Sequence, residues 1–191
     1  MTRTHTLNGK WLDLLNPTAD AMDLREIAWS LANSCRYNGC VRRFYSVAEH
    51  SVKMVRWAER EGLPESIRRG MLFHDAHEAY MGDITYPMQV ALFEGNPAAR
   101  HRYQEIKAGL DREILKLIGR PCDLDANEVH EADLRILLTE RAVLLDPGKP
   151  PLVWDLDTRG LTPLDVEIVG WDPMPAFRIF VDEAKSLGVT L

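Results

Sequence analysis

Apolar residues recur every three or four positions along most of this chain, which is the spacing of helices that bury one face. The pattern predicts helices over the following ranges: 23–34, 47–61, 64–81, 97–118, 125–145 and 173–187. Pro87 is expected to start a further short element, because proline favours the first position of a helix. The pattern therefore predicts an all-α fold.

Residues at the ends of these segments indicate where the elements begin. Asn8-Gly9 is a tight-turn signal between short apolar runs, so residues 6–15 are expected to form a small N-terminal β-hairpin. Ser46 is a favoured N-cap, and Glu49, three residues later, completes a capping box.

The C-terminal part of the chain gives weaker signals. Asp125 or Asn127 is expected to cap the helix that runs to about residue 145. The segment 149–173 is rich in proline, glycine and tryptophan, and we expect it to be irregular. We expect one domain over 1–191, with a core of about residues 20–145 on which the segment 149–191 packs.

Composition and charge narrow the classes of function. The chain has 191 residues, of which 46% are hydrophobic and 27% charged, as in an ordinary globular protein. Its net charge of -6 argues against a general affinity for nucleic acid polymers, although a local arginine cluster would suffice for a small phosphorylated substrate. No apolar run approaches the roughly 20 residues of a membrane span, and the start of the chain lacks a signal-peptide pattern. A cytoplasmic protein without membrane partners is expected.

The three cysteines do not indicate a metal knuckle or a disulfide scaffold. Cys35, Cys40 and Cys122 show no CxxC spacing, and their number is odd. We expect them to be reduced thiols with mainly structural roles.

Four metal-binding side chains lie at intervals along the predicted helices. His74 and Asp75 are adjacent within an apolar segment, His50 lies upstream and Asp133 downstream. Imidazole and carboxylate groups are costly to bury without partners, and a divalent metal ion satisfies both. Helical bundles assemble metal sites from several helices in this way. Two imidazoles and two carboxylates suit Zn, Co, Mn or Fe better than Ca, so one such ion is predicted.

Other polar residues near this set suggest catalysis and substrate binding. Glu78 follows His74 by one helical turn and could act as a general acid or base. Asp83, after Gly82, is expected to face the same cavity. Arg36 offers a guanidinium fork for a phosphate, and Tyr37 a flat ring for a base or sugar.

Four nearby side chains are not expected to bind the metal or the substrate. His77 and His130 are expected to lie at the surface or to support the ligands rather than to bind the metal. Arg42 is expected to be a solvated loop charge, as is its neighbour Arg43.

The order of these motifs resembles that of the HD-domain metal-dependent phosphohydrolases, in the branch of the bacterial 5′-deoxynucleotidases and the short phage-type dNTP triphosphohydrolases. The motifs that carry the resemblance lie within about residues 20–145: Arg36-Tyr37, the stretch 46–51 (SVAEHS), the stretch 74–87 (HDAHEAYMGDITYP) and the stretch 131–133 (EAD).

The resemblance implies an HD-type helical bundle and a set of functional residues. The metal ligands would be His50, His74, Asp75 and Asp133. Catalysis would involve Glu78 and Asp83, and substrate binding would involve Arg36, Tyr37 and Pro87. The deoxynucleotidases usually carry tryptophan where this chain has Tyr37, whereas the N-terminal TLNGKW and LLNP sequences look more like those of the triphosphohydrolases.

The predicted activity is metal-dependent hydrolysis of the 5′ phosphoester of a deoxynucleotide. The preferred substrate is a dNTP such as dATP, cleaved to deoxynucleoside and triphosphate, with additional Mg²⁺ carried on the substrate phosphates. One alternative is a 5′-nucleotidase that releases phosphate from a dNMP. Others are an alarmone or cyclic-nucleotide hydrolase and a non-catalytic nucleotide-binding regulator. A homo-oligomer is expected from the resemblance.

Overall fold

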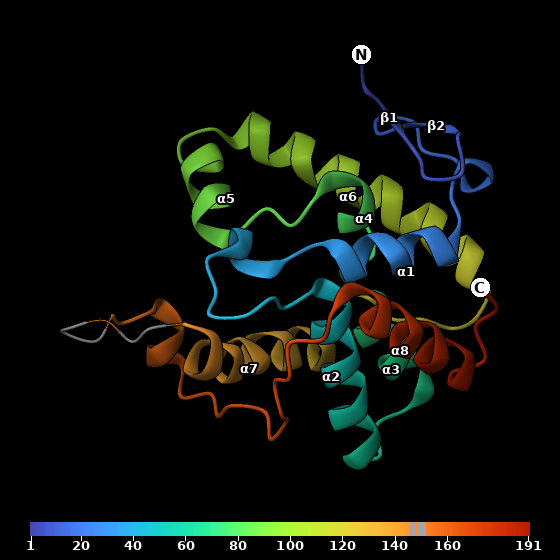
Figure 1. Ribbon diagram of the computed structural model, residues 1–191. Helices are drawn as coiled ribbons and strands as arrows, with labels where there is room; N and C mark the ends of the chain where they lie inside the picture. Colours follow the sequence, from blue (N-terminus) through green and yellow to red (C-terminus); the bar gives the residue numbers. More distant parts are fainter. Residues whose placement is uncertain (146–147, 149–151) are drawn as a thin grey trace.

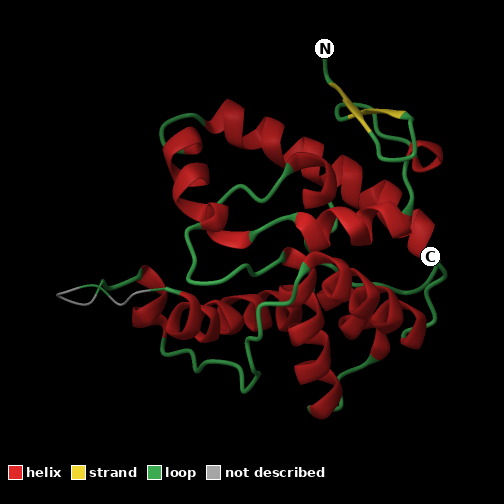
Figure 2. Cartoon of the chain, viewed as in Figure 1, coloured by secondary structure: helices red, strands yellow, loops and turns green. Residues whose placement is uncertain are grey.

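The computed structural model describes residues 1–145, 148 and 152–191, and this part of the chain is mainly helical (Figure 2). A two-stranded antiparallel hairpin, β1 (Arg3–His5) and β2 (Trp11–Asp13), precedes the helices. The helices follow in this order: α1 (Leu24–Asn33), α2 (Val47–Arg60), α3 (Glu65–Phe73), α4 (Glu78–Met81), α5 (Tyr86–Phe93), α6 (Pro97–Ile118), α7 (Asn127–Leu144) and α8 (Pro173–Ser186). This architecture confirms the prediction of an all-α fold with a small hairpin.

Helix α2 is the central element of the structure. It contacts α1, α3, α7 and α8, which surround it in Figure 1. Every residue from Val47 to Val55 is buried, although an isolated amphipathic helix would bury only one face. Glu49, His50 and Lys53 lie within this stretch, so each of these polar side chains needs a partner from another element.

The hairpin lies earlier in the chain than the turn signal suggests. β1 ends at His5, which pairs with Trp11, so five residues connect the strands rather than the Asn8-Gly9 pair alone. The Thr6 amide donates to the Lys10 carbonyl at 2.9 Å and closes this connection. Backbone amides of the turn also donate to the buried Glu26 carboxylate of α1. Tertiary contacts with α1 therefore help to set the turn.

Several predicted helix ends are confirmed. The side chain of Asp23 accepts hydrogen bonds from the first amides of α1, and Gly119 ends α6 in the left-handed conformation. The expected caps of α7 are wrong. Ala126 occupies the N-cap position, and neither Asp125 nor Asn127 does.

The predicted helix over 64–81 is also wrong, because it is two helices joined by a tight turn. α3 ends at Phe73, and α4 begins at Glu78. Between them the backbone makes i to i+3 hydrogen bonds, from Ala76 to Phe73 at 3.0 Å and from Glu78 to Asp75 at 2.9 Å. This tighter winding rotates the side chains after Phe73 away from the positions that a continuous α-helix would give them.

The C-terminal segment returns over the central helices. Residues 149–151 of the segment expected to be irregular lie outside the described residues. Within 152–172 there is one short 3-10 helix, Asp155–Arg159. α8 packs on α1 and α2, as Figure 1 shows. No helix in the described part of the chain combines the length and the apolarity needed to cross a membrane.

The predicted capping box at the start of α2 is half correct. The Ser46 hydroxyl accepts a hydrogen bond from the Glu49 amide at 3.1 Å, as expected. The Glu49 carboxylate instead accepts hydrogen bonds from the amides of Val169, Gly170 and Trp171, at 2.9, 3.1 and 2.6 Å. A fully buried carboxylate thus joins α2 to the segment that leads into α8.

Gly170 is required at this junction for two reasons. Its φ is +79°, a conformation that other residues rarely adopt. A Cβ atom at this position would also lie 2.8 Å from the Phe44 carbonyl oxygen.

We predict that Glu49→Gln destabilises the protein. The uncharged amide would accept fewer hydrogen bonds from the three amides, and we expect the free energy of unfolding to fall by about 2–4 kcal/mol. Urea unfolding of the protein after treatment with a metal chelator measures this loss. Glu59→Gln is the matched control, because Glu59 is exposed on the same helix, and it should change the value by less than about 0.5 kcal/mol. An equally small change for both variants would contradict the role of Glu49.

Candidate metal centre

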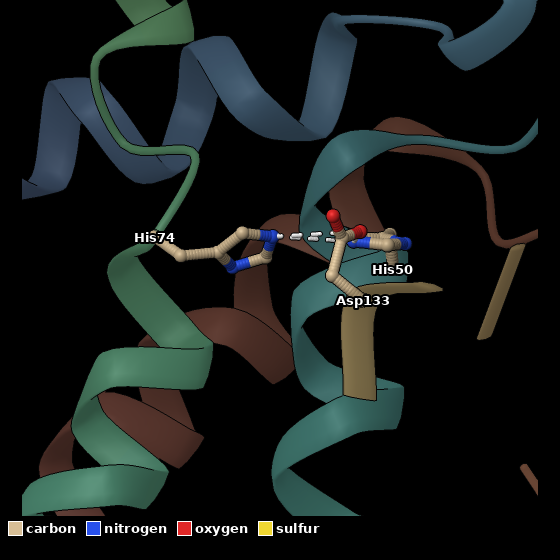
Figure 3. A group of neighbouring side chains, drawn as sticks. All are labelled: His50, His74 and Asp133. Atoms are coloured by element: carbon tan, nitrogen blue, oxygen red, sulfur yellow. Dashed lines mark hydrogen bonds and ion pairs between the residues drawn. The ribbon is translucent and has the colours of Figure 1, made fainter. Parts of the chain in front are cut away.

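The fold brings together the four side chains that the sequence singles out as metal ligands. His50 lies in the first turns of α2, His74 and Asp75 directly follow α3, and Asp133 projects from α7. The Nε2 atoms of His50 and His74 are 3.3 Å apart, and Asp133 Oδ1 is 3.2 Å from His50 Nε2 (Figure 3). Asp75 Oδ2 is 3.1 Å from His74 Nε2. Donor atoms of His50, His74 and Asp133 therefore lie together, with Asp75 beside the two histidines.

The protonation of the two histidines tests whether a metal ion fits. His74 Nδ1 lies 2.9 Å from the carbonyl oxygen of Met71, which can only accept, so this nitrogen carries a proton. His50 Nδ1 lies 2.6 Å from a carboxylate oxygen of Glu140 and donates to it in the same way. In the neutral rings both Nε2 atoms then have lone pairs, and these face each other. A cation between them removes the repulsion.

The distances within the set also suit a single ion. Nitrogen and oxygen ligands lie about 2.0–2.2 Å from a divalent ion such as zinc, so neighbouring ligand atoms are about 3–4 Å apart. His50 Nε2 is 3.9 Å from Asp75 Oδ2, and His74 Nε2 is 4.0 Å from Asp133 Oδ1. His50, His74 and Asp133 are thus positioned so that they could hold a metal ion, with Asp75 beside them.

Glu140 is a buried partner of this centre that the sequence analysis missed. It lies two helical turns after Asp133 on α7, and its side chain is fully buried. Besides His50, it accepts a hydrogen bond from the Tyr37 hydroxyl at 2.6 Å and lies 3.4 Å from Arg36 Nε. A carboxylate that orients a metal-binding histidine is a common supporting element. The only signal in the sequence is an acidic residue on the predicted apolar face, seven positions after Asp133.

The electrostatics of the centre favour a cation. Burial alone would raise the pKa of Glu140, but Arg36 and His50 lower it to about 2. Burial and the Arg36 charge lower the pKa of His50, yet Glu140 and Asp133 outweigh them and raise it to about 9. The carboxylates that would hold a proton on His50 are the ones that would attract a metal ion to the same place.

Arg36 lies between the metal ligands and Glu140. Its side chain is almost fully buried, and its Nη1 atom donates to Asp75 Oδ2 over 3.5 Å. Its Nε faces Glu140 Oε2 at 3.4 Å, an ion pair without hydrogen-bond geometry. The guanidinium therefore stays charged at the centre, and its Nη atoms carry further N–H donors.

The loop that carries Arg36 has an unusual backbone. Tyr37 and Asn38 follow it with φ of 58° and 53°, in the left-handed region that non-glycine residues seldom adopt. This conformation turns the Tyr37 hydroxyl onto Glu140. The contact of Tyr37 with a base or sugar stays a prediction.

The other expected site residues lie on or near α4 and α5. Glu78 begins α4, and burial together with Asp75 and Asp83 raises its pKa well above the usual range. Burial raises the pKa of Asp83, which lies close enough to Arg36 and Asp75 to be affected by their charges. Pro87 is exposed in the first turn of α5.

The remaining histidines near the site differ in their surroundings. His130 is exposed on α7. His77 is 3% exposed, and its Nδ1 lies 3.1 Å from Asp111 of α6, so it is not a surface residue.

We predict that Glu140→Gln weakens metal binding. Without its charge, residue 140 would hold the His50 ring less firmly and lower its basicity, and we expect a loss of about 10- to 100-fold in affinity. Isothermal titration of the chelated protein with Zn²⁺ or Mn²⁺ measures this change. Glu131→Gln, an exposed substitution on the same helix, should leave the affinity unchanged. An equal affinity for both variants would show that Glu140 does not support the centre.

Comparisons with known proteins show relatives whose names state no activity. No family model matches the chain. It is 34% identical over 151 residues to the uncharacterized protein YfdR of Escherichia coli (strain K12), a match that covers 78% of this chain and 76% of that protein. It is 35% identical over 124 residues to the uncharacterized protein RCAP_rcc00048 of Rhodobacter capsulatus, which covers 63% of this chain and 60% of that protein. Because the match to YfdR extends over most of both chains, this protein belongs to the YfdR family.

Proposed function

We propose that this protein is a metal-dependent phosphohydrolase of the HD-domain type that cleaves the 5′ phosphoester of deoxynucleotides. The observation that carries the proposal is the convergence of two imidazole nitrogens and two carboxylates beside a buried guanidinium. A cation-binding cluster next to a fixed positive charge is suited to a substrate phosphate. The order of the motifs along the chain, which resembles that of the HD-domain enzymes, supports the same proposal.

The ligand set would supply the metal chemistry of the reaction. A divalent ion held by His50, His74, Asp75 and Asp133 would polarise a phosphoryl oxygen and lower the pKa of the attacking water. Glu140 keeps the His50 ring in the tautomer that such an ion needs.

The chain's own side chains would position the substrate and move protons. Arg36 would bind the phosphate, because its buried guanidinium lies beside the metal ligands, with Nη1 3.5 Å from Asp75 Oδ2. Glu78 has a shielded carboxyl oxygen that lacks a partner in the described part of the chain. It is therefore placed to exchange a proton with the attacking water or the leaving 5′ oxygen, and Asp83 assists at the sugar end. Positioning and charge neutralisation carry most of the catalysis in phosphoryl transfer.

The preferred substrate is a deoxynucleoside triphosphate such as dATP. This preference rests on the N-terminal sequence, which looks like that of the short triphosphohydrolases and folds as the hairpin anchored on α1. Products would be the deoxynucleoside and intact triphosphate. A dNMP 5′-nucleotidase uses the same centre and is the second candidate, since Arg36 can bind a single phosphate equally well.

Product analysis tests the proposal. The purified protein is incubated with Mn²⁺, Co²⁺, Zn²⁺ or Mg²⁺ and a panel of dNMPs, dNTPs and ribonucleotides, and the products are separated by chromatography. We expect deoxynucleoside and triphosphate from dNTPs. Deoxynucleoside and phosphate from dNMPs alone would identify the 5′-nucleotidase. The absence of turnover with every metal would contradict the proposal and favour an alarmone hydrolase or a nucleotide-binding regulator.

We predict that Glu78→Ala abolishes turnover without emptying the His50 centre. Loss of the proton-transfer group should lower kcat by about 10²- to 10⁴-fold. Steady-state kinetics and metal analysis of the same sample measure the two properties. Glu94→Ala, a substitution of an exposed residue at the end of α5, should retain activity. Full activity of Glu78→Ala would show that the catalytic assignment is wrong.

A further inference from the structure

A second group of metal-binding side chains adjoins the first. A carboxylate oxygen of Asp75, a ring nitrogen of His77 and a carboxylate oxygen of Glu78 all lie within 4.8 Å of one another. The tight turn between α3 and α4 creates this arrangement, because its winding brings three residues that are close in sequence to one side. Asp75 is also 3.1 Å from His74, so it borders both groups.

His77 is held in the same way as His50. Its Nδ1 lies 3.1 Å from Asp111 Oδ1, and the other oxygen of Asp111 accepts a hydrogen bond from Lys107 Nζ at 2.8 Å. The paired carboxylate accepts the Nδ1 proton, which leaves a lone pair on Nε2 of the neutral ring. A buried histidine whose Nδ1 is bound by a carboxylate of a neighbouring helix is typical of metal ligands.

Glu78 supplies an independent sign that a ligand is missing. Its Oε2 atom is shielded from solvent and has no hydrogen-bond partner among the described residues. A shielded carboxyl oxygen without a donor is costly, and the neighbouring Asp75 carboxylate increases this cost. A cation bound between the two carboxylates would satisfy both.

The charges around the two groups do not balance with one ion. The carboxyl groups of the region come from Asp75, Glu78, Asp83, Asp111, Asp133 and Glu140. The permanent positive charges among the residues that contact them are Arg36 and Lys107. With all six carboxyl groups ionised, one divalent ion at the His50 centre would leave an excess of about two negative charges among these described residues, which a second divalent ion would neutralise.

We propose that Asp75, His77 and Glu78 form a second divalent-cation site, adjacent to the centre of His50, His74 and Asp133. A donor set of one imidazole and two carboxylates suits an ion such as Mn²⁺. The site does not depend on the proposed activity, because it follows from the positions of the donors and their missing partners, and it makes Glu78 a metal ligand in place of the proton-transfer group. Asp75 contributes to both sites, so the two ions bind side by side.

The test is the stoichiometry of Mn²⁺ binding to the chelated full-length protein, measured by isothermal titration and by electron paramagnetic resonance of the free ion. We expect about two ions per chain for the wild type and about one for His77→Gln. His130→Gln, a substitution of an exposed histidine on α7, is the control and should bind as the wild type does. Circular dichroism and thermal unfolding of each chelated variant show whether it is folded.

Further variants keep the result unambiguous. If His77→Gln does not fold, Glu78→Gln decides, since it preserves volume and should also bind about one ion. The double variant His50→Gln, His74→Gln should retain about one ion at the second site. If the wild type binds two ions and both His77→Gln and Glu78→Gln also bind two, the proposal is overturned. A wild type that binds a single ion, which both variants keep, would overturn it as well.

One outcome separates this site from the proposed function. If the wild type binds a single ion that His77→Gln loses and the double variant keeps, the second site exists and the His50 centre does not hold Mn²⁺. If the ion is instead lost only in the double variant, the His50 centre stands and the second site is refuted.

Discussion

His50 and His74 point ring nitrogens at each other over 3.3 Å, while carboxylates of Asp75 and Asp133 crowd the same space. With both rings neutral, such an arrangement is unfavourable by itself, because lone pairs and negative charges repel in a region shielded from water. The packing of α2 against α3 and α7 holds the groups in place despite this repulsion. The apolar core thus holds together a set of side chains that could bind a cation, and the candidate functions depend on that set.

The burial of α2 is possible only because its polar side chains find partners far along the chain. His50 is bound by Glu140, 90 residues later, and Glu49 by amides about 120 residues later. Both partners are charged or strongly polar, and hydrogen bonds to ionised groups are among the stronger ones in proteins. His50 therefore connects the candidate metal centre to the core, and its neighbour Glu49 connects the C-terminal segment to the core.

Local signals in the sequence predicted much of the fold. Asp23, Ser46 and Gly119 mark the ends of α1, α2 and α6 because capping depends on neighbouring backbone groups alone. The end of α3 at Phe73 was not predictable in this way, since residues 74–81 have no proline and no glycine before the break at Gly82. There the tighter winding accompanies a local contact of His74 with the Met71 carbonyl and a tertiary contact of His77 with Asp111, which propensity does not reveal.

The residues of the candidate site were likewise predictable only in part. His50, His74, Asp75 and Asp133 could be singled out because their types and order carry the chemistry. Glu140 and the Asp111 partner of His77 could not, because an acidic residue on a helix is usually solvated and its burial becomes visible only in three dimensions. The left-handed backbone at Tyr37 and Asn38 was equally hidden, since neither residue requires it.

The link between Glu49 and the amides of residues 169–171 has a consequence for the order of events during biosynthesis. Until those residues have left the ribosome, the first turn of α2 contains a carboxylate that has no donors in the interior, and this turn also carries His50. The nascent chain can form α1, α3 and α7 earlier, but the turn that carries His50 becomes stable only after synthesis of the segment before α8. A metal ion with His50 as a ligand would therefore bind only after that segment has been synthesised.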